Sequence, residues 1–247
     1  MNAVAIRRED KNKWERRTPL IPRHVKELVD KHHVTVVVEH QDNRAFSDQE
    51  YSEAGAKIVT DLSPFPIIMG IKEIPVSQIL PNKTYIIFSH TIKGQLFSMP
   101  MLRKMIQQKC TLIDYECIRD RKNRRLVSFG RFAGIAGMID SLYILGQQLE
   151  LNKIPNPVRK MQPAFRYKDL KHAKSAIKKV AIEYSNLIDQ SMAPLIVGLV
   201  GYGQVSHGAQ EILDLFPVAE ISPTELQKNT GLKPEIIYKV IFAEKDL

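Results

Sequence analysis

The sequence predicts an α/β protein with two Rossmann-like domains and mostly parallel sheets, the second of them truncated. Two observations lead to this prediction. Short apolar runs alternate with helical patterns over residues 2–115, which is typical of a parallel sheet with helices on both faces. A further apolar run at residues 195–200, expected to be a buried parallel strand, leads through Gly201-Tyr-Gly203 directly into a helical pattern. A chain of 247 residues is long enough to bury two modest cores.

The first half of the chain alternates strand and helix signals. A helix is expected to begin at Pro22, because proline suits the first helical position and Val25, Leu28 and Val29 follow at helical spacing. Further helices are expected near residues 48–53 and 95–108. The expected strands cover residues 2–6, 34–38, 57–59, 66–71, 84–88, 111–115 and 126–129.

A long helix at residues 132–150 and the pair Pro155 and Pro157 separate the two halves. We therefore expect a substrate-binding and catalytic domain at residues 1–130, a connecting helix and linker at 131–155, and a partial dinucleotide-binding domain at 156–247. Small residues near the start of the long helix let it pack closely or admit a ligand. A strand is expected at residues 218–221, followed by one or two short helices, so the last 25 residues cannot complete a dinucleotide-binding fold.

The composition indicates which classes of binding partner the protein can have. Much of the formal charge of +9 lies between Lys153 and Lys179, and the lysine-rich helix face there is expected to be solvated. No aromatic-interleaved basic motif accompanies it, and no apolar run could span a bilayer, so neither nucleic acid nor membrane is expected as a partner. Cys110 and Cys117 are interpreted as buried thiols without disulfide or metal. The location expected from the sequence as given is cytoplasmic, or the mitochondrial matrix if a transit peptide is missing.

The turn after residues 195–200 has the layout of a dinucleotide-binding turn. Gly201 allows a tight turn, Gly203 lets the main chain approach a pyrophosphate, and the N–H groups of Gln204, Val205 and Ser206 attract that anion. The alternative is a tight strand-to-helix turn that binds nothing.

The fit to the usual G-x-G-x-x-G pattern is incomplete. Ser206 stands where the third glycine is usual, and Gly208 follows two residues later. Glu220, at the end of the next expected strand, can hydrogen-bond an adenosine ribose and favour NAD, or it is a surface acid.

Two polar residues follow neighbouring expected strands in the first half. Lys72 ends the run at residues 67–72, and His90 ends the run at 85–90, so both are expected at the carboxyl edge of the sheet. Histidine titrates near neutral pH, and a lysine can be brought toward it by burial or a neighbouring cation, so the pair can act as acid and base. A surface lysine and a capping histidine are the alternative.

Arginines and acids lie near the same edge. Arg17 can hold a substrate carboxylate through two parallel hydrogen bonds, although a salt bridge to Glu15 or Asp10 is equally compatible with the sequence. Glu73 can tune Lys72, and Glu116 can lie at the neighbouring strand end.

Six stretches resemble the lysine–2-oxoglutarate reductase part of aminoadipic semialdehyde synthase, and more distantly fungal saccharopine dehydrogenase and alanine dehydrogenase. They occur in the same order along nearly the whole chain; residues 151–192 match least. The stretches are residues 14–22 (WERRTPLIP), 70–75 (GIKEIP), 88–93 (FSHTIK), 112–116 (LIDYE), 129–138 (FGRFAGIAGM) and 201–210 (GYGQVSHGAQ).

The resemblance implies condensation of L-lysine with 2-oxoglutarate and reduction of the imine to saccharopine by NADPH, in a cleft between two domains. It implies Lys72 and His90 as the acid and base, Arg17 as the holder of a substrate carboxylate, and Glu73 and Glu116 as flanking acids. Expected partners also include a second copy of the chain or a fused saccharopine dehydrogenase domain. Glu220 instead favours NADH, and relatives of this type continue beyond residue 247.

Two alternatives stay open from the sequence. One is an alanine-dehydrogenase-like amino acid dehydrogenase, which the same lysine, histidine and arginine can serve. The other is a non-catalytic regulatory or binding protein with an incomplete cofactor site.

Overall fold

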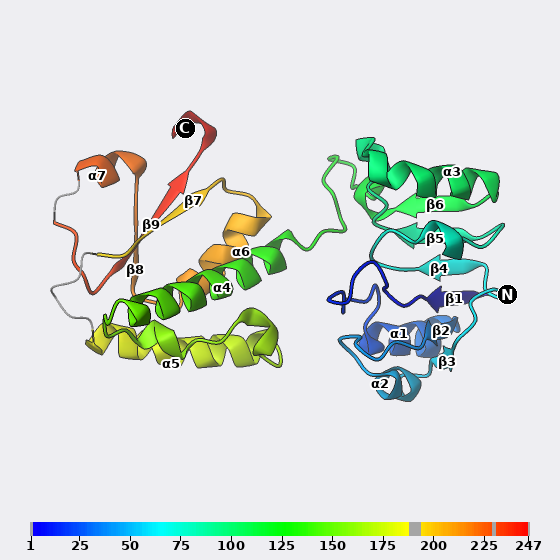
Figure 1. Ribbon diagram of the computed structural model, residues 1–247, viewed down its shortest axis with the longest axis horizontal. Coiled ribbons are helices and arrows are strands. Elements are labelled where there is room, and N and C mark those ends of the chain that lie inside the picture. Colours follow the sequence, from blue (N-terminus) through cyan, green and yellow to red (C-terminus); the bar gives the residue numbers. More distant parts are fainter. Residues whose placement is uncertain (1, 188–193, 229–230, 247) are drawn as a thin grey trace. The chain divides into compact units, whose positions relative to one another are not determined.

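The computed structural model describes residues 2–187, 194–228 and 231–246. They form two units, residues 1–128 and 129–247 (Figure 1). The first unit thus ends two residues before the predicted boundary at residue 130. The helix predicted as a connection is part of the second unit, where it packs against the helix that follows the glycine turn.

A six-stranded parallel sheet forms the centre of the first unit. Its order is β3-β2-β1-β4-β5-β6, so the order reverses between β1 and β4. Ligands of open α/β sheets bind beyond the carboxyl ends of the strands at such a point. The strands are β1 (Ala3–Ile6), β2 (Thr35–Glu39), β3 (Lys57–Val59), β4 (Ile67–Met69), β5 (Thr84–Ile87) and β6 (Thr111–Asp114).

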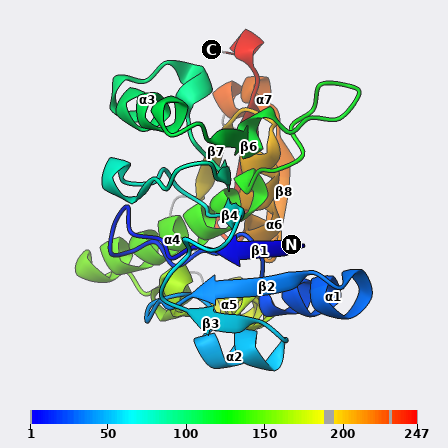
Figure 2. The same cartoon turned by 90° about the vertical axis from the view of Figure 1, so that its right-hand side faces the viewer.

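Helices cover both faces of this sheet, as the alternation of strand and helix predicts. Because side chains alternate along a strand, Ala5 and Ile6 belong to different buried clusters. Ile6 packs with Val25 of α1 (Pro22–His32) and Tyr51 of α2 (Asp48–Glu53), and Ala5 packs in the cluster of α3 (Met99–Gln107). Figure 2 shows α1 and α2 beside β2 and β3, and α3 beside β6.

The helix starts in this unit have local causes. Pro22 occupies the first position of α1, where its missing N–H costs no helical hydrogen bond. At α2, Ser47 and Glu50 form a capping box: the Ser47 hydroxyl accepts from the Glu50 N–H, and the Glu50 carboxylate accepts from the Ser47 N–H. These helices therefore begin where the sequence predicts.

The second unit contains a three-stranded parallel sheet in the order β7-β9-β8. One buried cluster joins this sheet to α4, α5 and α6. The strands are β7 (Ile196–Val200), β8 (Val218–Ile221) and β9 (Ile237–Phe242), and the helices are α4 (Gly130–Leu151), α5 (Leu170–Leu187), α6 (Gln204–Leu213) and α7 (Pro223–Lys228).

Two glycines bring α4 and α6 into backbone contact. A Cβ atom at Gly134 would lie 1.9 Å from the Val205 carbonyl oxygen, and one at Gly208 would lie 1.9 Å from the Arg131 carbonyl oxygen. Neither position can hold a larger residue without moving the helices apart. Gly208 thus serves close packing, two residues beyond the place where the usual pattern has its third glycine.

Several sequence predictions are wrong. Residues 126–129 form no strand, and the Leu126 N–H instead donates to the Ile118 carbonyl in a loop. Strand β9 lies in the segment where only short helices were expected. Cys117 is exposed and Cys110 is partly buried, so they are not two buried thiols.

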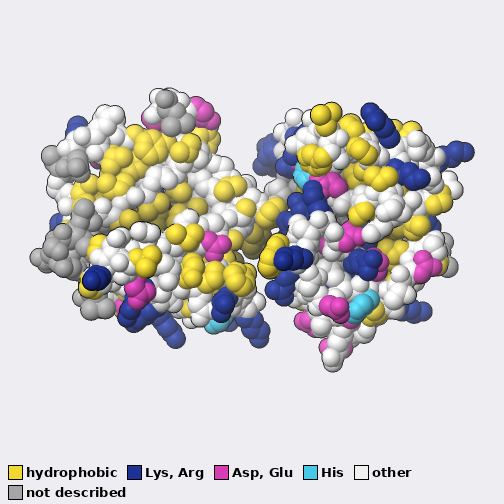
Figure 3. Space-filling view, in the orientation of Figure 1, with side chains coloured by type: hydrophobic (Ala, Val, Ile, Leu, Met, Phe, Trp, Pro, Cys, Tyr) yellow, Lys and Arg dark blue, Asp and Glu magenta, His cyan; other side chains and the backbone are white. Residues whose placement is uncertain are grey.

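Strand β7 is parallel as predicted, but it is not buried. It lies at an edge of its sheet, and alternate side chains point away from the helices: Ile196 is 38% exposed and Val200 is 71% exposed. Figure 3 shows hydrophobic side chains gathered over this sheet. Over the part of the chain that the structure describes, no helix is long and apolar enough to cross a membrane.

Candidate active site and cofactor turn

The loops after β4 and β5 meet at the carboxyl edge of the first sheet. The two strands are parallel neighbours, which confirms that Lys72 and His90 follow adjacent strands. His90 has a left-handed backbone (φ 54°) and precedes a 3-10 turn, Thr91–Lys93. Lys and Arg side chains gather at this edge with acids and a histidine among them (Figure 3).

Glu73 joins these two loops to the loop after β1. One carboxylate oxygen lies 2.6 Å from His90 Nδ1, and the other accepts a 2.6 Å hydrogen bond from Lys11 Nζ. Burial opposes ionisation of this carboxyl, but the hydrogen bonds from Lys11 and His90 outweigh it and hold the pKa of Glu73 below its ordinary value. Glu73 is therefore an ionised acceptor at neutral pH.

Lys72 is half-buried beside this group. Its backbone N–H donates to a carboxylate oxygen of Glu9 at 3.0 Å. Within the described residues its ammonium forms no hydrogen bond or ion pair, although its charge helps to lower the pKa of Glu15. The acids around Lys72 thus accept hydrogen bonds from groups other than the Lys72 ammonium.

Arg17 is paired with Glu15 in the same loop. The guanidinium Nε and Nη2 donate to the two carboxylate oxygens at 2.7 and 2.5 Å, and the Arg17 N–H donates to one of them at 3.1 Å. Burial acts to raise the pKa of Glu15, but the hydrogen bonds from Arg17 outweigh it and lower that pKa. The hydrogen bond to Glu15 in turn raises the pKa of Arg17. The salt bridge allowed by the sequence is therefore present, and a substrate carboxylate would meet a guanidinium already oriented by Glu15.

Glu116 follows β6 and is buried at the same edge. Its Oε1 pairs with Lys93 at 3.0 Å and with Arg125, while its Oε2 is buried without a hydrogen-bond partner among the described residues. Burial opposes ionisation, but the two cations lower the pKa of Glu116. Asp114 fixes this turn by accepting from the Glu116 N–H at 2.8 Å and from the Ser89 hydroxyl.

The glycine turn of the second unit has space beside it. Gly201 has φ +93°, a conformation that side chains disfavour, and its N–H donates to the Phe242 carbonyl at 2.8 Å. A Cβ atom at Gly201 or Gly203 would meet nothing within 4 Å. Helix α6 begins at Gln204 without a side-chain cap, so the first N–H groups, those of Gln204, Val205 and Ser206, have no partner within the helix.

Glu220 is placed differently from a ribose-binding acid next to that turn. Strand β9 lies between β7 and β8, and the Glu220 carboxylate is 3.3 Å from Lys239 Nζ on β9. Lys239 also pairs with Asp214 at 3.0 Å. Glu220 thus belongs to an ion-pair cluster that joins β8, β9 and the end of α6.

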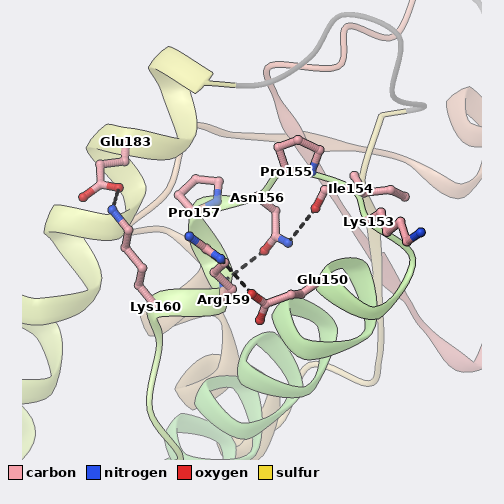
Figure 4. A pocket seen from close by; sticks show the side chains of 9 residues that line it. All are labelled: Glu150, Lys153, Ile154, Pro155, Asn156, Pro157, Arg159, Lys160 and Glu183. Atoms are coloured by element: carbon pink, nitrogen blue, oxygen red, sulfur yellow. Dashed lines mark hydrogen bonds and ion pairs between the residues drawn. The ribbon is translucent and has the colours of Figure 1, made fainter.

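A hollow of about 420 Å³ in the second unit contains none of the sequence-predicted site residues (Figure 4). Four of its charged side chains pair with one another: Arg159 with Glu150 at 2.7 Å, and Lys160 with Glu183. Lys153 also lines the hollow and has no ion pair among the described residues. In the described ranges, no group of three or more His, Cys, Asp and Glu residues could hold a metal ion.

Sequence reasoning missed Glu9 and Lys11, whereas the pairing of Arg17 with Glu15 was one of its two alternatives. These residues follow β1, at the point where the strand order reverses. The signal that could have found them is an acidic residue three positions after a buried strand, inside a segment otherwise dominated by Lys and Arg.

The two units define the class of the protein: an α/β protein with parallel, Rossmann-like sheets and polar side chains at the carboxyl ends of the first. The chain belongs to the family described as "Alanine dehydrogenase/PNT, N-terminal domain", which matches residues 5–136.

Curated relatives align with a longer part of the chain than the family model does. The chain is 38% identical over 226 residues to "Alpha-aminoadipic semialdehyde synthase, mitochondrial" of Bos taurus, and 38% over 252 residues to "Alpha-aminoadipic semialdehyde synthase" of Arabidopsis thaliana. These alignments cover 91% and 96% of the chain but 24% of each relative. "Saccharopine dehydrogenase [NAD(+), L-lysine-forming]" of Schizosaccharomyces pombe is 30% identical over 80% of the chain and 54% of that protein. The chain thus spans about a quarter of the length of the first two relatives.

Solved structures share the fold. An L-alanine dehydrogenase matches with a TM-score of 0.61 at 19% identity, covering 96% of this chain and 60% of that one. A transhydrogenase from Sinorhizobium meliloti matches with a TM-score of 0.52 at 15% identity, covering 96% and 61%. At these identities the likeness concerns the fold alone.

Proposed function

We propose that this chain belongs to an NADPH-dependent oxidoreductase of lysine metabolism that condenses L-lysine with 2-oxoglutarate and reduces the imine to saccharopine. The names of the semialdehyde synthase and saccharopine dehydrogenase relatives support this class of substrate. The observation that carries the proposal is the state of the groups around Lys72. Glu9 accepts from the backbone N–H groups of Ile71 and Lys72, Glu15 from Arg17, and Glu73 from Lys11 and His90. None of these carboxylates binds the Lys72 ammonium, which leaves that ammonium available for a substrate.

The reaction needs protons moved at two stages. The substrate ε-ammonium loses a proton before its nitrogen attacks the keto carbon, and the resulting carbinolamine loses water to give the imine. Lys72 is proposed as one proton-transfer group and His90 as the other. Both lie at the carboxyl edge of the sheet, where a keto acid can reach both side chains.

The hydrogen bond to Glu73 decides which nitrogen of His90 exchanges protons. Because Glu73 is ionised, it can only accept, so Nδ1 carries the hydrogen that it donates. Nε2 is then the nitrogen that can take up or release a proton toward the substrate. Glu73 thereby fixes both the ring orientation and the tautomer.

Cationic groups at this edge are proposed to hold the substrate carboxylates. Arg17 is the main candidate, since a guanidinium presents planar, paired donors to a carboxylate and Glu15 already orients it. Glu116, whose carboxylate pairs with Lys93 and Arg125, is proposed as an acid that flanks the substrate site and orients these cations.

The glycine turn fits a nicotinamide dinucleotide. The open space beside Gly201 and Gly203 and the uncapped start of α6 suit a pyrophosphate, which backbone N–H groups and the helix dipole would bind. When bound, such a cofactor supplies the hydride that reduces the imine carbon. Lys239 already pairs with Glu220, which weakens the case for a ribose-binding acid and favours NADPH over NADH.

The direct test is NADPH oxidation by the full-length protein that contains this segment. We expect oxidation only when L-lysine and 2-oxoglutarate are both present, with saccharopine detected by mass spectrometry, and a higher kcat/KM with NADPH than with NADH. Pyruvate with ammonia serves as the comparison. If pyruvate and ammonia are turned over while L-lysine and 2-oxoglutarate are not, the proposal is wrong and the activity is that of an alanine-dehydrogenase-like enzyme.

A further inference from the structure

Glu9 is a buried carboxylate that binds two consecutive backbone N–H groups. It lies three residues beyond β1 and is 6% exposed. One oxygen accepts from the Ile71 N–H at 2.6 Å, and the other accepts from the Lys72 N–H at 3.0 Å. The acid side chain of one loop thus holds the main chain of another, 62 and 63 residues further along.

These two N–H groups lie just beyond the regular hydrogen bonding of β4. The Gly70 N–H still donates to the Ile86 carbonyl of β5, at 3.0 Å. Beyond that point the next two N–H groups donate to Glu9 instead, while the Ile71 carbonyl still accepts from the Phe88 N–H at 3.1 Å. The carboxylate thus contributes to the direction in which the chain leaves β4, and Lys72 is the second residue that it holds.

The surroundings fix Glu9 itself. Its own N–H donates to the Gln41 side chain at 3.0 Å. Gly70 leaves room for it, because a Cβ atom there would lie 3.1 Å from Glu9 Oε1 and 3.0 Å from the Arg7 side chain. Burial raises the pKa of Glu9, and its N–H partners and Arg7 oppose that rise. Both oxygens of Glu9 act as hydrogen-bond acceptors, although burial disfavours the charged form of this side chain.

We propose that Glu9 is a positioning residue for the proposed reaction: by binding the N–H groups of Ile71 and Lys72, it sets the orientation from which the Lys72 side chain reaches the substrate. The inference rests on the proposed function. A misplacement of about 1 Å in a catalytic group can lower turnover by about 100-fold, so an orienting contact at its own backbone is expected to affect kcat.

The test variant is Glu9→Gln in the full-length protein. Glutamine has nearly the same shape but only one acceptor oxygen, so its NH2 group would face one of the two N–H groups. We expect kcat to fall by about 10- to 100-fold, with the KM for 2-oxoglutarate within about threefold of wild type. Hydrogen exchange should become faster in peptides that contain residues 71 and 72.

Tyr85→Phe is the matched control. The Tyr85 hydroxyl is also a buried side-chain acceptor for a backbone N–H, that of Leu80 at 2.8 Å, but it lies near the amino end of β5. We expect this variant to lose stability without a comparable loss of kcat. If both variants lose kcat in proportion to their fall in Tm, Glu9 is structural and the proposal is wrong.

Glu9→Asp covers the case in which Glu9→Gln fails to fold. It keeps the charge but shortens the side chain, so a lower kcat at nearly unchanged Tm supports the proposal, and a wild-type kcat overturns it. Wild-type protein without any lysine-dependent NADPH oxidation would instead contradict the proposed function. A Glu9→Gln variant with wild-type kcat and wild-type exchange at residues 71 and 72 contradicts only the positioning role.

Discussion

Glu73 shows how one half-buried acid can organise a site made of three loops. It is bound by Lys11 from the loop after β1 and by His90 from the loop after β5. Removing its charge would leave two donors without an ionised partner at an edge already rich in cations. The same carboxylate therefore contributes both to the stability of the first unit and to the tautomer of His90.

The pKa of Glu73 gives this contribution a defined pH dependence. A carboxyl whose pKa is lower in the folded protein stabilises it above the ordinary value of 4.5, and that stabilisation is lost as pH falls through the lowered pKa. We expect Glu73→Gln to lower the free energy of unfolding by about 1–2 kcal/mol at pH 7. Urea unfolding between pH 3 and 7 measures this, and a difference from wild type that does not shrink in acid would contradict it.

Lys72 and His90 are expected to be needed for turnover and not for folding. Lys72→Met and His90→Gln should each lower kcat by about 100- to 10,000-fold and change its pH profile, because each removes a proton-transfer group. Circular dichroism should show an unchanged fold. Lys104→Met and His32→Gln, which change the same residue types on helices α3 and α1, are the controls. Wild-type rates in both site variants would show that the acid–base assignment is wrong.

The contact between α4 and α6 depends on the absence of side chains at particular positions. Gly134→Ala and Gly208→Ala each place a methyl group against a carbonyl of the other helix, so each should destabilise the protein by about 1–3 kcal/mol. Gly137→Ala lies on the same helix with nothing within 4 Å of the new methyl group, and should be neutral or stabilise by up to about 1 kcal/mol. Thermal unfolding of the three variants compares them directly, and equal effects would refute the close-packing explanation.

Elements with strong local signals could be predicted from the sequence. Pro22 and the capping residues around Ser47 determine where α1 and α2 begin, and apolar runs identify the six strands of the first sheet. Strand β9 was missed although residues 236–242 are mostly β-branched or aromatic, because a proline-containing segment precedes them. Residues 126–129 gave the opposite error, since a short apolar run there forms a loop.

The adjacency of the loops that carry Lys72 and His90 could also be predicted, because it follows from the parallel arrangement of consecutive strands. The side chains that bind these loops, Glu9 and Lys11, could not be predicted. Glu9 and Lys11 reach their contacts only because β1 and β4 are neighbours, and that depends on strand order, which local sequence does not encode. The pairing of Glu220 with Lys239 likewise depends on the insertion of β9 between β7 and β8.

The two units have separate buried clusters, and this has a consequence for folding. Both buried clusters of the first unit contain only residues of the first unit, and the buried cluster of the second unit contains only residues of the second unit. We expect residues 1–128, produced alone, to fold with cooperative thermal unfolding and native-like circular dichroism. A broad, non-cooperative transition would show that the first unit needs the rest of the chain.

The edge position of β7 links the glycine turn to local opening of the chain. Among the described strands, β7 is hydrogen-bonded to β9 alone, so a single ladder holds the segment that leads into Gly201. Edge strands open at lower free energy than central strands, and their amides exchange with solvent sooner. The turn is thus attached to an edge strand, which opens more easily than the central strand β9, and a bound dinucleotide would act there as a clamp, slowing amide exchange along residues 196–201.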